Sequence, residues 1–152
     1  MGLEGYVHGF EIDPDHSLHI YKGSLVRVQA DALVSSDDND LSAGGGVSRA
    51  LANVAGIDVA RERQEIAYQH RPRLGDVVRT SAGGLPCRYL YPAITIDHDS
   101  GAYMDEAALR QLVANLLEQA TQDGIRSIGM PALGTGAAAF DLGQASEIII
   151  DE

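Results

Sequence analysis

Residues 31–47, DALVSSDDNDLSAGGGV, decide the fold of this chain. The apolar run 32–34 predicts a buried strand, and the polar residues 35–40 that follow it predict a loop. Three consecutive glycines at 44–46 then precede a helical pattern that starts at Val47. Glycines let the backbone approach a ligand closely, and the free N–H groups of a first helical turn attract an anion such as phosphate. The stretch therefore predicts a phosphate-binding loop, although a glycine-rich connection without a ligand fits one short motif equally well.

A second segment, residues 125–136 (IRSIGMPALGTG), repeats this arrangement. Ile125 and Ile128 predict a short strand, Pro131 predicts a turn, and the glycine loop 134–136 follows. In open α/β sheets ligands bind beyond the carboxyl ends of the strands, so two glycine loops that both follow strands can line one crevice. Two such loops of backbone N–H groups suit a diphosphate.

The composition indicates a globular protein. The 152 residues are 45% hydrophobic and 22% charged, which fits a single domain over residues 1–152 with a core large enough to fold alone. No apolar run approaches the roughly 20 residues of a membrane helix, and the N-terminus lacks the basic start and apolar stretch of a signal peptide. We therefore expect a cytoplasmic protein without a membrane anchor.

The charge of the chain bears on its partners. A net charge of −11, from 22 acidic and 11 basic residues, disfavours a broad surface for the backbone of DNA or RNA. A small nucleotide is compatible with it, because backbone amides and helix dipoles hold phosphates without cationic side chains. The single cysteine, Cys87, lies in a predicted strand and is interpreted as a buried, inert thiol.

The remaining sequence alternates between strand and helix patterns. Apolar or alternating runs predict strands at 6–10, 18–22, 75–80 and 87–96, the last two joined as a hairpin. Apolar residues at helical spacing predict helices from 47 to about 56, from about 58 onward, at 103–122 and at 142–150. On the first of these helices, Ser48 and Asn53 are expected on exposed or ligand-facing sides.

The chain ends on an apolar sequence, residues 148–150, followed only by Asp151 and Glu152. An apolar segment at such a position normally packs against another element. We therefore expect either that the domain is part of a longer protein, with a C-terminal strand or helix still to follow, or that its closing element comes from elsewhere.

Histidines and acidic residues raise the question of a metal. His8, His16 and His19 have no cysteine or acidic ligands at a known spacing, so we interpret them as solvated or hydrogen-bonded side chains. Residues 97–101, DHDSG, invite a catalytic or metal interpretation, but a polar loop that caps the next helix is favoured. The sequence predicts no metal site and no cofactor.

In their combined order these motifs resemble the macro domain, the family of ADP-ribose-binding modules, in a divergent bacterial-type form. The resemblance runs from residue 23 to about residue 150 and rests on DALV at 31–34, GGGV at 44–47, GDVVRTSAGGLP at 75–86, the long helix, and SIGMPALGTG at 127–136. It implies a three-layer α/β/α sandwich with a central mixed β-sheet, and a cleft in which the glycine loops hold the diphosphate of ADP-ribose. The implied partner is ADP-ribose or a related NAD-derived nucleotide, free or protein-linked, with a fused effector domain as a further expectation.

The resemblance also implies a set of ligand-binding residues. They are Ser24, Leu25, Asp38, Asn39, Gly44, Gly45, Gly46, Val47, Gly134, Thr135, Gly136, Ala137, Ala138 and Phe140. Asp38 takes the place of the family's asparagine near the distal ribose, where a carboxylate can accept from ribose hydroxyls, and the neighbouring Asn39 can supply the amide instead. The position of the family's aromatic in the second loop is Ala138, so Phe140 is the expected stacking residue.

Three departures from the family's commonest pattern bear on activity. The aspartate that recognises the adenine amino group falls at Ser24, whose hydroxyl can hydrogen-bond but carries no charge. The family's Asn-Ala-Ala-Asn becomes SSDD at 35–38, and the aspartate that follows GGGV in one hydrolase branch is Ser48.

Hydrolysis of an ADP-ribosyl ester requires an activated water. With serine at the usual carboxylate position, the weak candidates for the base are Asp37 and Asp38, and His98 is a more distant third. The acidic loop 37–40 can equally cap nearby N–H groups. Three functions therefore stay open: an ADP-ribose-binding module, an ADP-ribosyl hydrolase, and an interaction scaffold that kept the fold and lost the ligand.

Overall fold

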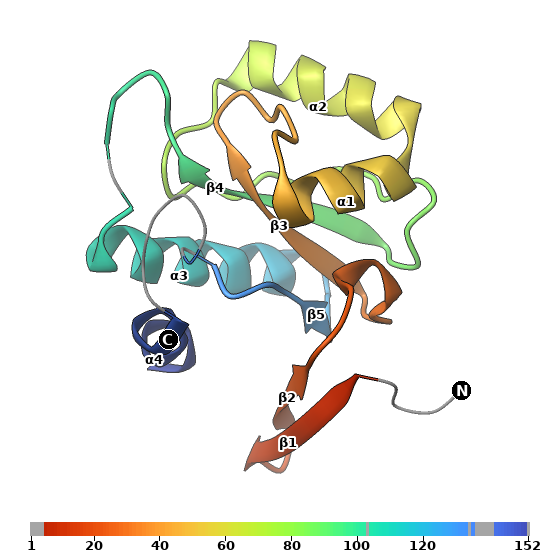
Figure 1. Ribbon diagram of the computed structural model, residues 1–152, viewed down its shortest axis with the longest axis vertical. Helices are drawn as coiled ribbons and strands as arrows, with labels where there is room; N and C mark the ends of the chain where they lie inside the picture. The colour runs from red at the N-terminus through yellow and green to blue at the C-terminus, as the bar shows by residue number, and fades with distance from the viewer. Residues whose placement is uncertain (1–4, 103, 134, 136–141, 152) are drawn as a thin grey trace.

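The computed structural model describes residues 5–102, 104–133, 135 and 142–151 (Figure 1). Its elements follow one another as β1 (Tyr6–Asp13), β2 (His16–Tyr21), the 3-10 helix η1 (Leu25–Arg27), β3 (Ala32–Asp38), α1 (Gly46–Ala55), α2 (Ile57–His70), β4 (Tyr89–Ile96), α3 (Glu106–Gln122), β5 (Ile128–Gly129) and α4 (Leu142–Asp151). Among the described helices, none has both the length and the apolar character needed to cross a membrane.

Strand β3 is the centre of the main sheet. It pairs in parallel with β4 on one side and with β5 on the other. Residues 75–80 run antiparallel along the far side of β4, through bridges from Val77 to Ala93 and from Thr80 to Leu90. The central sheet is therefore mixed, and the predicted pairing of 75–80 with the 87–96 strand is confirmed, although regular strand begins only at Tyr89.

Helices cover both faces of this sheet (Figure 1). Successive side chains of a strand point to opposite faces. Leu33 of β3 belongs to a cluster with Leu51 of α1 and Val59 of α2, whereas Ala32 and Val34 belong to a cluster with the apolar residues of α3. The continuous apolar run at 32–34 is thus explained by burial on both faces, and the predicted three-layer α/β/α architecture is confirmed.

The predicted helix boundaries agree closely with the structure. Gly56, with a φ of +96°, separates α1 from α2. Helix α3 begins at Glu106 because the Asp105 carboxylate accepts a hydrogen bond from the Ala108 N–H (2.8 Å) and caps the helix. Gly124, with a φ of +67°, follows the end of α3.

The β1–β2 hairpin and helix α4 lie at the two ends of the chain. Strands β1 and β2 form a separate antiparallel hairpin that lies apart from the central layers (Figure 1), with Phe10, Ile12 and Ile20 exposed. The predicted last helix is α4, in which Ile148 is buried against the α3 side of the core while Ile150 is 65% exposed. The apolar C-terminal sequence is therefore only partly covered.

Candidate functional site

The loop after β3 is organised by the side chain of Asp38. One carboxylate oxygen accepts hydrogen bonds from the N–H groups of Asp40 (3.0 Å) and Ser42 (3.1 Å), and the other accepts one from the Ser42 hydroxyl. Aspartate readily forms such local bonds to the following backbone, which is why the chain turns here. The half-buried Asp38 thus has both oxygens engaged by its own loop, the capping arrangement considered above as the alternative to catalysis.

The neighbouring Asn39 side chain connects this loop to the segment after β4. Its Nδ2 donates to the Asp99 carboxylate (2.9 Å), and its Oδ1 accepts from the His98 N–H (2.9 Å). Asn39 is buried, whereas His98 and Asp99 are exposed. An amide suits this position because it both donates and accepts. The carboxyl ends of β3 and β4 are held together at this edge of the sheet.

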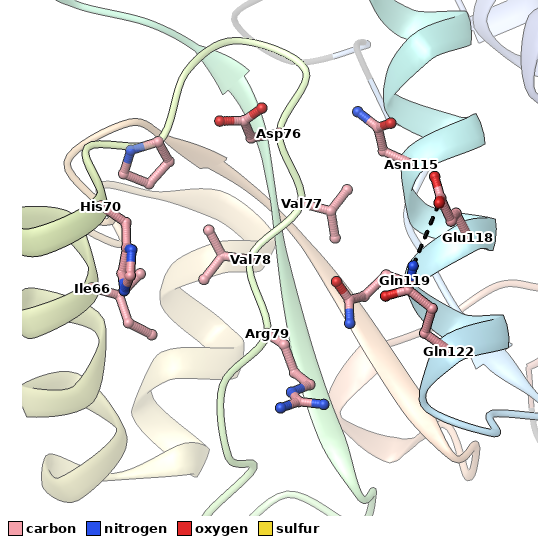
Figure 2. Close-up of a pocket in the computed structure, with 11 residues that line it drawn as sticks. Ile66, His70, Asp76, Val77, Val78, Arg79, Asn115, Glu118, Gln119 and Gln122 are labelled. Atoms are coloured by element: carbon pink, nitrogen blue, oxygen red, sulfur yellow. Dashed lines mark hydrogen bonds between the residues drawn. The ribbon is translucent and has the colours of Figure 1, made fainter.

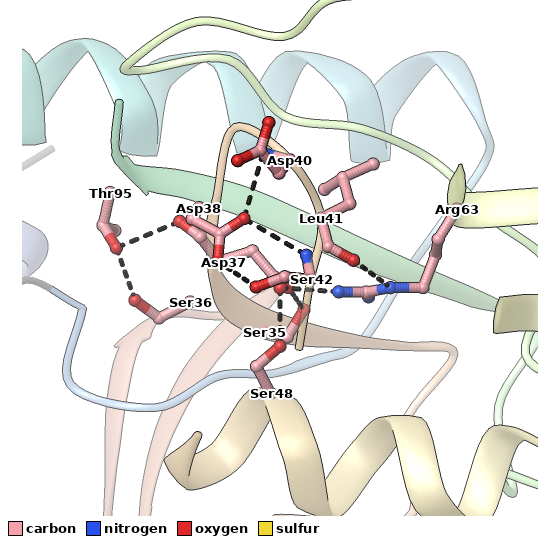
Figure 3. A network of polar contacts seen from close by, with 10 residues as sticks. All are labelled: Ser35, Ser36, Asp37, Asp38, Asp40, Leu41, Ser42, Ser48, Arg63 and Thr95. Carbon is pink, nitrogen blue, oxygen red and sulfur yellow. Dashed lines mark hydrogen bonds and ion pairs between the residues drawn. The ribbon is translucent and has the colours of Figure 1, made fainter. Parts of the chain in front are cut away.

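Asp37, the other candidate for a catalytic base, lies beneath the loop (Figure 3). Its Oδ1 accepts from the Ser48 hydroxyl (2.6 Å) and from Nη2 of Arg63 (2.6 Å), and its Oδ2 accepts from the Ser35 hydroxyl (2.5 Å). The Asp37 side chain is fully buried. The prediction that Ser48 lies on an exposed or ligand-facing side is wrong, because its hydroxyl turns inward to this carboxylate and the residue is buried.

The N-terminus of α1 has no side-chain cap. Gly45 is the N-cap and provides no side chain to bond the first N–H groups, and the first turn carries no acidic residue. These N–H groups have no intrahelical partner and lie at the positive end of the helix dipole. A Cβ built on Gly45 or Gly46 would meet no atom within 4 Å among the described residues. Gly44 presents its carbonyl to Nη2 of Arg49 (2.6 Å).

The structure describes only some of the other predicted ligand-binding residues. Ser24 is exposed and precedes η1, while Leu25 is half-buried and lies against Gly129 of β5. In the second glycine loop, the Thr135 hydroxyl donates to the Ala132 carbonyl (2.7 Å). The remaining predicted residues of that loop lie outside the described residues: Gly134, Gly136, Ala137, Ala138 and Phe140.

Asp97, which follows β4, anchors the adjoining segment. Its carboxylate accepts from the N–H groups of Asp99 (3.0 Å) and Ser100 (3.1 Å) and from Nε of Arg73 (3.0 Å). Burial by itself would raise the pKa of Asp97, but these hydrogen bonds outweigh it and hold the pKa well below its ordinary value. The interpretation of 97–101 as a polar loop agrees with this bonding, but the expectation that it caps the next helix is wrong, because Asp105 caps α3.

Two other features could be mistaken for the site. Asp38, Asp40 and His98 offer ligand atoms that lie within 4.8 Å of one another, but Asp38 is already occupied by its own loop and we assign no metal there. A groove of about 580 Å³ lies between α2, residues 76–79 and α3 (Figure 2). It contains none of the predicted ligand-binding residues, and its lining includes Asp76, Arg79, Asn115 and Glu118.

Comparison with known proteins agrees with the resemblance of the sequence to the macro domain. The family model of the macro domain matches residues 34–149. An O-acetyl-ADP-ribose deacetylase of Escherichia fergusonii is 28% identical over 134 residues, which cover 88% of this chain and 76% of that protein. Several other relatives are much longer, and the chain spans only 21% to 36% of their length.

Solved structures show the same fold. The macrodomain of Oceanobacillus iheyensis with ADP superposes with a TM-score of 0.84 at 23% identity, covering 95% of this chain and 78% of that one. A Trypanosoma brucei macrodomain in complex with ADP-ribose has a TM-score of 0.73 at 28% identity, covering 86% of this chain and 53% of that one.

Proposed function

The chain belongs to the macro domain family, and from this premise we propose that it binds ADP-ribose or a related NAD-derived nucleotide at the N-terminus of α1. The observation that carries the proposal is the uncapped first turn of α1, where no described atom lies within 4 Å of a Cβ built on Gly45 or Gly46. The family relationship and the T. brucei macrodomain in complex with ADP-ribose support the choice of ligand.

The chemistry of the site suits a diphosphate. Unpaired N–H groups and the helix dipole attract an anion, and glycines at 44–46 allow its oxygens to come close to the backbone. No cationic side chain is required, which is compatible with an acidic chain of net charge −11. The resemblance to the family assigns the ribose next to this diphosphate to Asp38, at the end of β3, and to Asn39, which follows it.

Binding is tested by calorimetric titration of the purified chain with ADP-ribose, with AMP and NAD as comparison ligands. We expect a micromolar Kd, equivalent to about −8 kcal/mol. Gly45→Glu should abolish the heat, because the added carboxylate enters the open space where the phosphates bind and the backbone there, with a φ of 175°, accepts any residue.

The matched control is Gln64→Glu, which adds the same charge on the exposed side of α2 and should bind as the unmodified chain does. An unmodified chain that gives neither heat nor a thermal shift with ADP-ribose would contradict the proposal. Equal affinity of Gly45→Glu and Gln64→Glu would place the ligand elsewhere.

Hydrolysis is the second candidate function, favoured by the name of the E. fergusonii relative, an O-acetyl-ADP-ribose deacetylase. In this chain the position of the family's hydrolase aspartate is Ser48, which is buried and donates to Asp37. A water would then have to be activated by Asp38 or by a phosphate of the substrate. Release of acetate from O-acetyl-ADP-ribose tests this activity, and unchanged turnover in Asp38→Ala would exclude Asp38 as the base.

A further inference from the structure

We propose that Arg63 of α2 is a positioning residue that holds the loop between β3 and α1 in its ligand-binding conformation, an inference that rests on the function proposed above. Arg63 lies 26 positions from Asp37 and does not belong to either glycine loop. It nevertheless joins the loop, through the Leu41 carbonyl, to the buried layer beneath it.

The contacts of Arg63 reach two separate parts of the site (Figure 3). Its Nη2 pairs with Asp37 Oδ1 at 2.6 Å, and its Nε donates to the Leu41 carbonyl at 3.4 Å. The side chain is 2% exposed, and its Nη1 has no hydrogen-bond partner among the described residues. A guanidinium presents separate nitrogens to the two acceptors in a fixed planar fork, whereas a lysine offers a single nitrogen, so a lysine is not equivalent here.

The partner carboxylate extends this connection to α1. The same Asp37 oxygen that pairs with Arg63 also accepts from the Ser48 hydroxyl, and Ser48 lies in the first turn of α1. The buried pair therefore connects the end of β3, the loop and the helix terminus whose N–H groups form the proposed phosphate site. A displacement of Arg63 would act on all three.

The loop needs such support because its backbone is strained. Leu41 and Ala43 have φ values of +52° and +54°, a left-handed conformation that residues with a Cβ rarely adopt. Strained residues persist only where their surroundings impose the conformation. Asp38 holds the loop from within through the N–H groups of Asp40 and Ser42, and Arg63 holds it from below through the Leu41 carbonyl.

A contribution to stability does not by itself explain the buried ion pair of Asp37 and Arg63. Burying two charges carries a large desolvation cost, and replacing a buried pair by apolar residues is often neutral or stabilising, whereas removing one partner strands a charge. The double variant Asp37→Ala/Arg63→Met therefore removes both charges and should keep the fold, while it frees the Leu41 carbonyl. It separates positioning from folding, which neither single variant can do.

The first measurement is hydrogen exchange by mass spectrometry without any nucleotide. We expect amides 39–46 to exchange at least tenfold faster in the double variant, with α3 unchanged. Because no ligand is present, this arm decides the role of the Arg63–Asp37 pair even if the unmodified chain binds no ADP-ribose, an outcome that would count against the proposed function alone. Unchanged exchange of 39–46 would overturn the inference.

The second measurement is ADP-ribose affinity. We expect the double variant to bind at least tenfold more weakly, and Ala43→Gly in that background to recover at least threefold, because glycine adopts the left-handed conformation without strain. A role of Arg63 in folding alone would not be relieved by a glycine in the loop. Unreduced affinity of the double variant would overturn the inference.

Discussion

The side chain of Asn39, at the end of β3, donates from Nδ2 to the carboxylate of Asp99, 2.9 Å away and 60 positions later in the chain. The backbone N–H of Asn39 also donates to the Ile96 carbonyl (2.9 Å), and its side-chain oxygen accepts from the His98 N–H. The two parallel strands thus continue to be connected beyond their last paired residues. This connection fixes the edge of the sheet at which we place the nucleotide.

Asn39→Asp is predicted to destabilise the protein by about 1–3 kcal/mol at neutral pH, because it removes a buried donor and sets a second carboxylate against Asp99. Urea unfolding measures the difference. The effect should diminish in acid, where protonation of the new carboxyl group restores a donor. Asn53→Asp, on an exposed side of α1, is the matched control and should change stability by no more than about 0.5 kcal/mol. Equal effects of the two variants would contradict the role of the Asn39 bridge.

The lowered pKa of Asp97 predicts a contribution to stability that depends on pH. Burial opposes its ionisation, but hydrogen bonds from the Ser100 N–H and Arg73 favour the charged form. A carboxyl group whose pKa is lower in the folded state stabilises the fold above its unfolded pKa of about 3.9, and this contribution is lost as the pH falls further. Asp97→Asn should therefore be less stable than the unmodified chain at pH 7, and this difference in stability should narrow below about pH 4.

Thermal unfolding of both proteins between pH 3 and pH 7 checks this prediction. Asp58→Asn is the matched control, since the Asp58 side chain is 94% exposed and its removal takes away the same charge without a buried partner. A constant difference between Asp97→Asn and the unmodified chain over the whole range would contradict the assignment.

Much of the fold could be predicted from local patterns, because those patterns report burial and helix ends directly. The apolar run at 32–34 is a strand covered on both faces, and the glycines at 44–46 lead into α1, which begins at Gly46, one residue before the expected start. The helical spacing of Leu109, Leu112 and Leu116 corresponds to the buried face of α3. In each case neighbouring residues in the sequence carry the signal.

The buried polar cluster could not be predicted in the same way. Arg63 lies in a helix rich in charged residues, where an arginine is normally solvated, and its burial depends on a carboxylate 26 positions earlier. Ser48 is turned inward by that same carboxylate. The doublet Asp37–Asp38 shows the difficulty most clearly, because consecutive residues of a strand face opposite ways and only the fold decides which is buried.

Gly83 is predicted to be indispensable for packing the loop after residue 80 against the end of α1. Its φ is +56°, and a Cβ there would lie 2.0 Å from the Ala55 carbonyl oxygen. Gly83→Ala should therefore cost more than about 3 kcal/mol, the sum of a left-handed penalty of roughly 1–2 kcal/mol and a backbone clash. Gly101→Ala is the control, because Gly101 has a φ of +65° but no described atom within 4 Å of a Cβ built there, so only the left-handed penalty applies. Chemical denaturation of both variants separates the left-handed penalty from the backbone clash. Similar losses of stability in the two variants would show that a backbone shift relieves the clash.

The hydroxyl of Tyr91 donates to Asp123 (2.6 Å) on the α3 side of the core. Burial and the adjacent carboxylate raise the pKa of Tyr91, while the same carboxylate also accepts from Nη1 of Arg79 (2.5 Å). A raised pKa in the folded state means that Tyr91 stabilises the fold below its unfolded pKa of about 10 and that this contribution is lost as the pH rises beyond it. Titration of tyrosinate absorbance should show a step that occurs late, together with unfolding.

Tyr91→Phe should remove this late step and cost about 1.5–3 kcal/mol at neutral pH, since the lost hydrogen bond is to a charged acceptor. Tyr68→Phe is the control, because Tyr68 is 82% exposed and its removal should leave the late step intact. A late step that survives in Tyr91→Phe would assign it to another tyrosine, and the pairing with Asp123 would then not explain the alkaline behaviour of the protein.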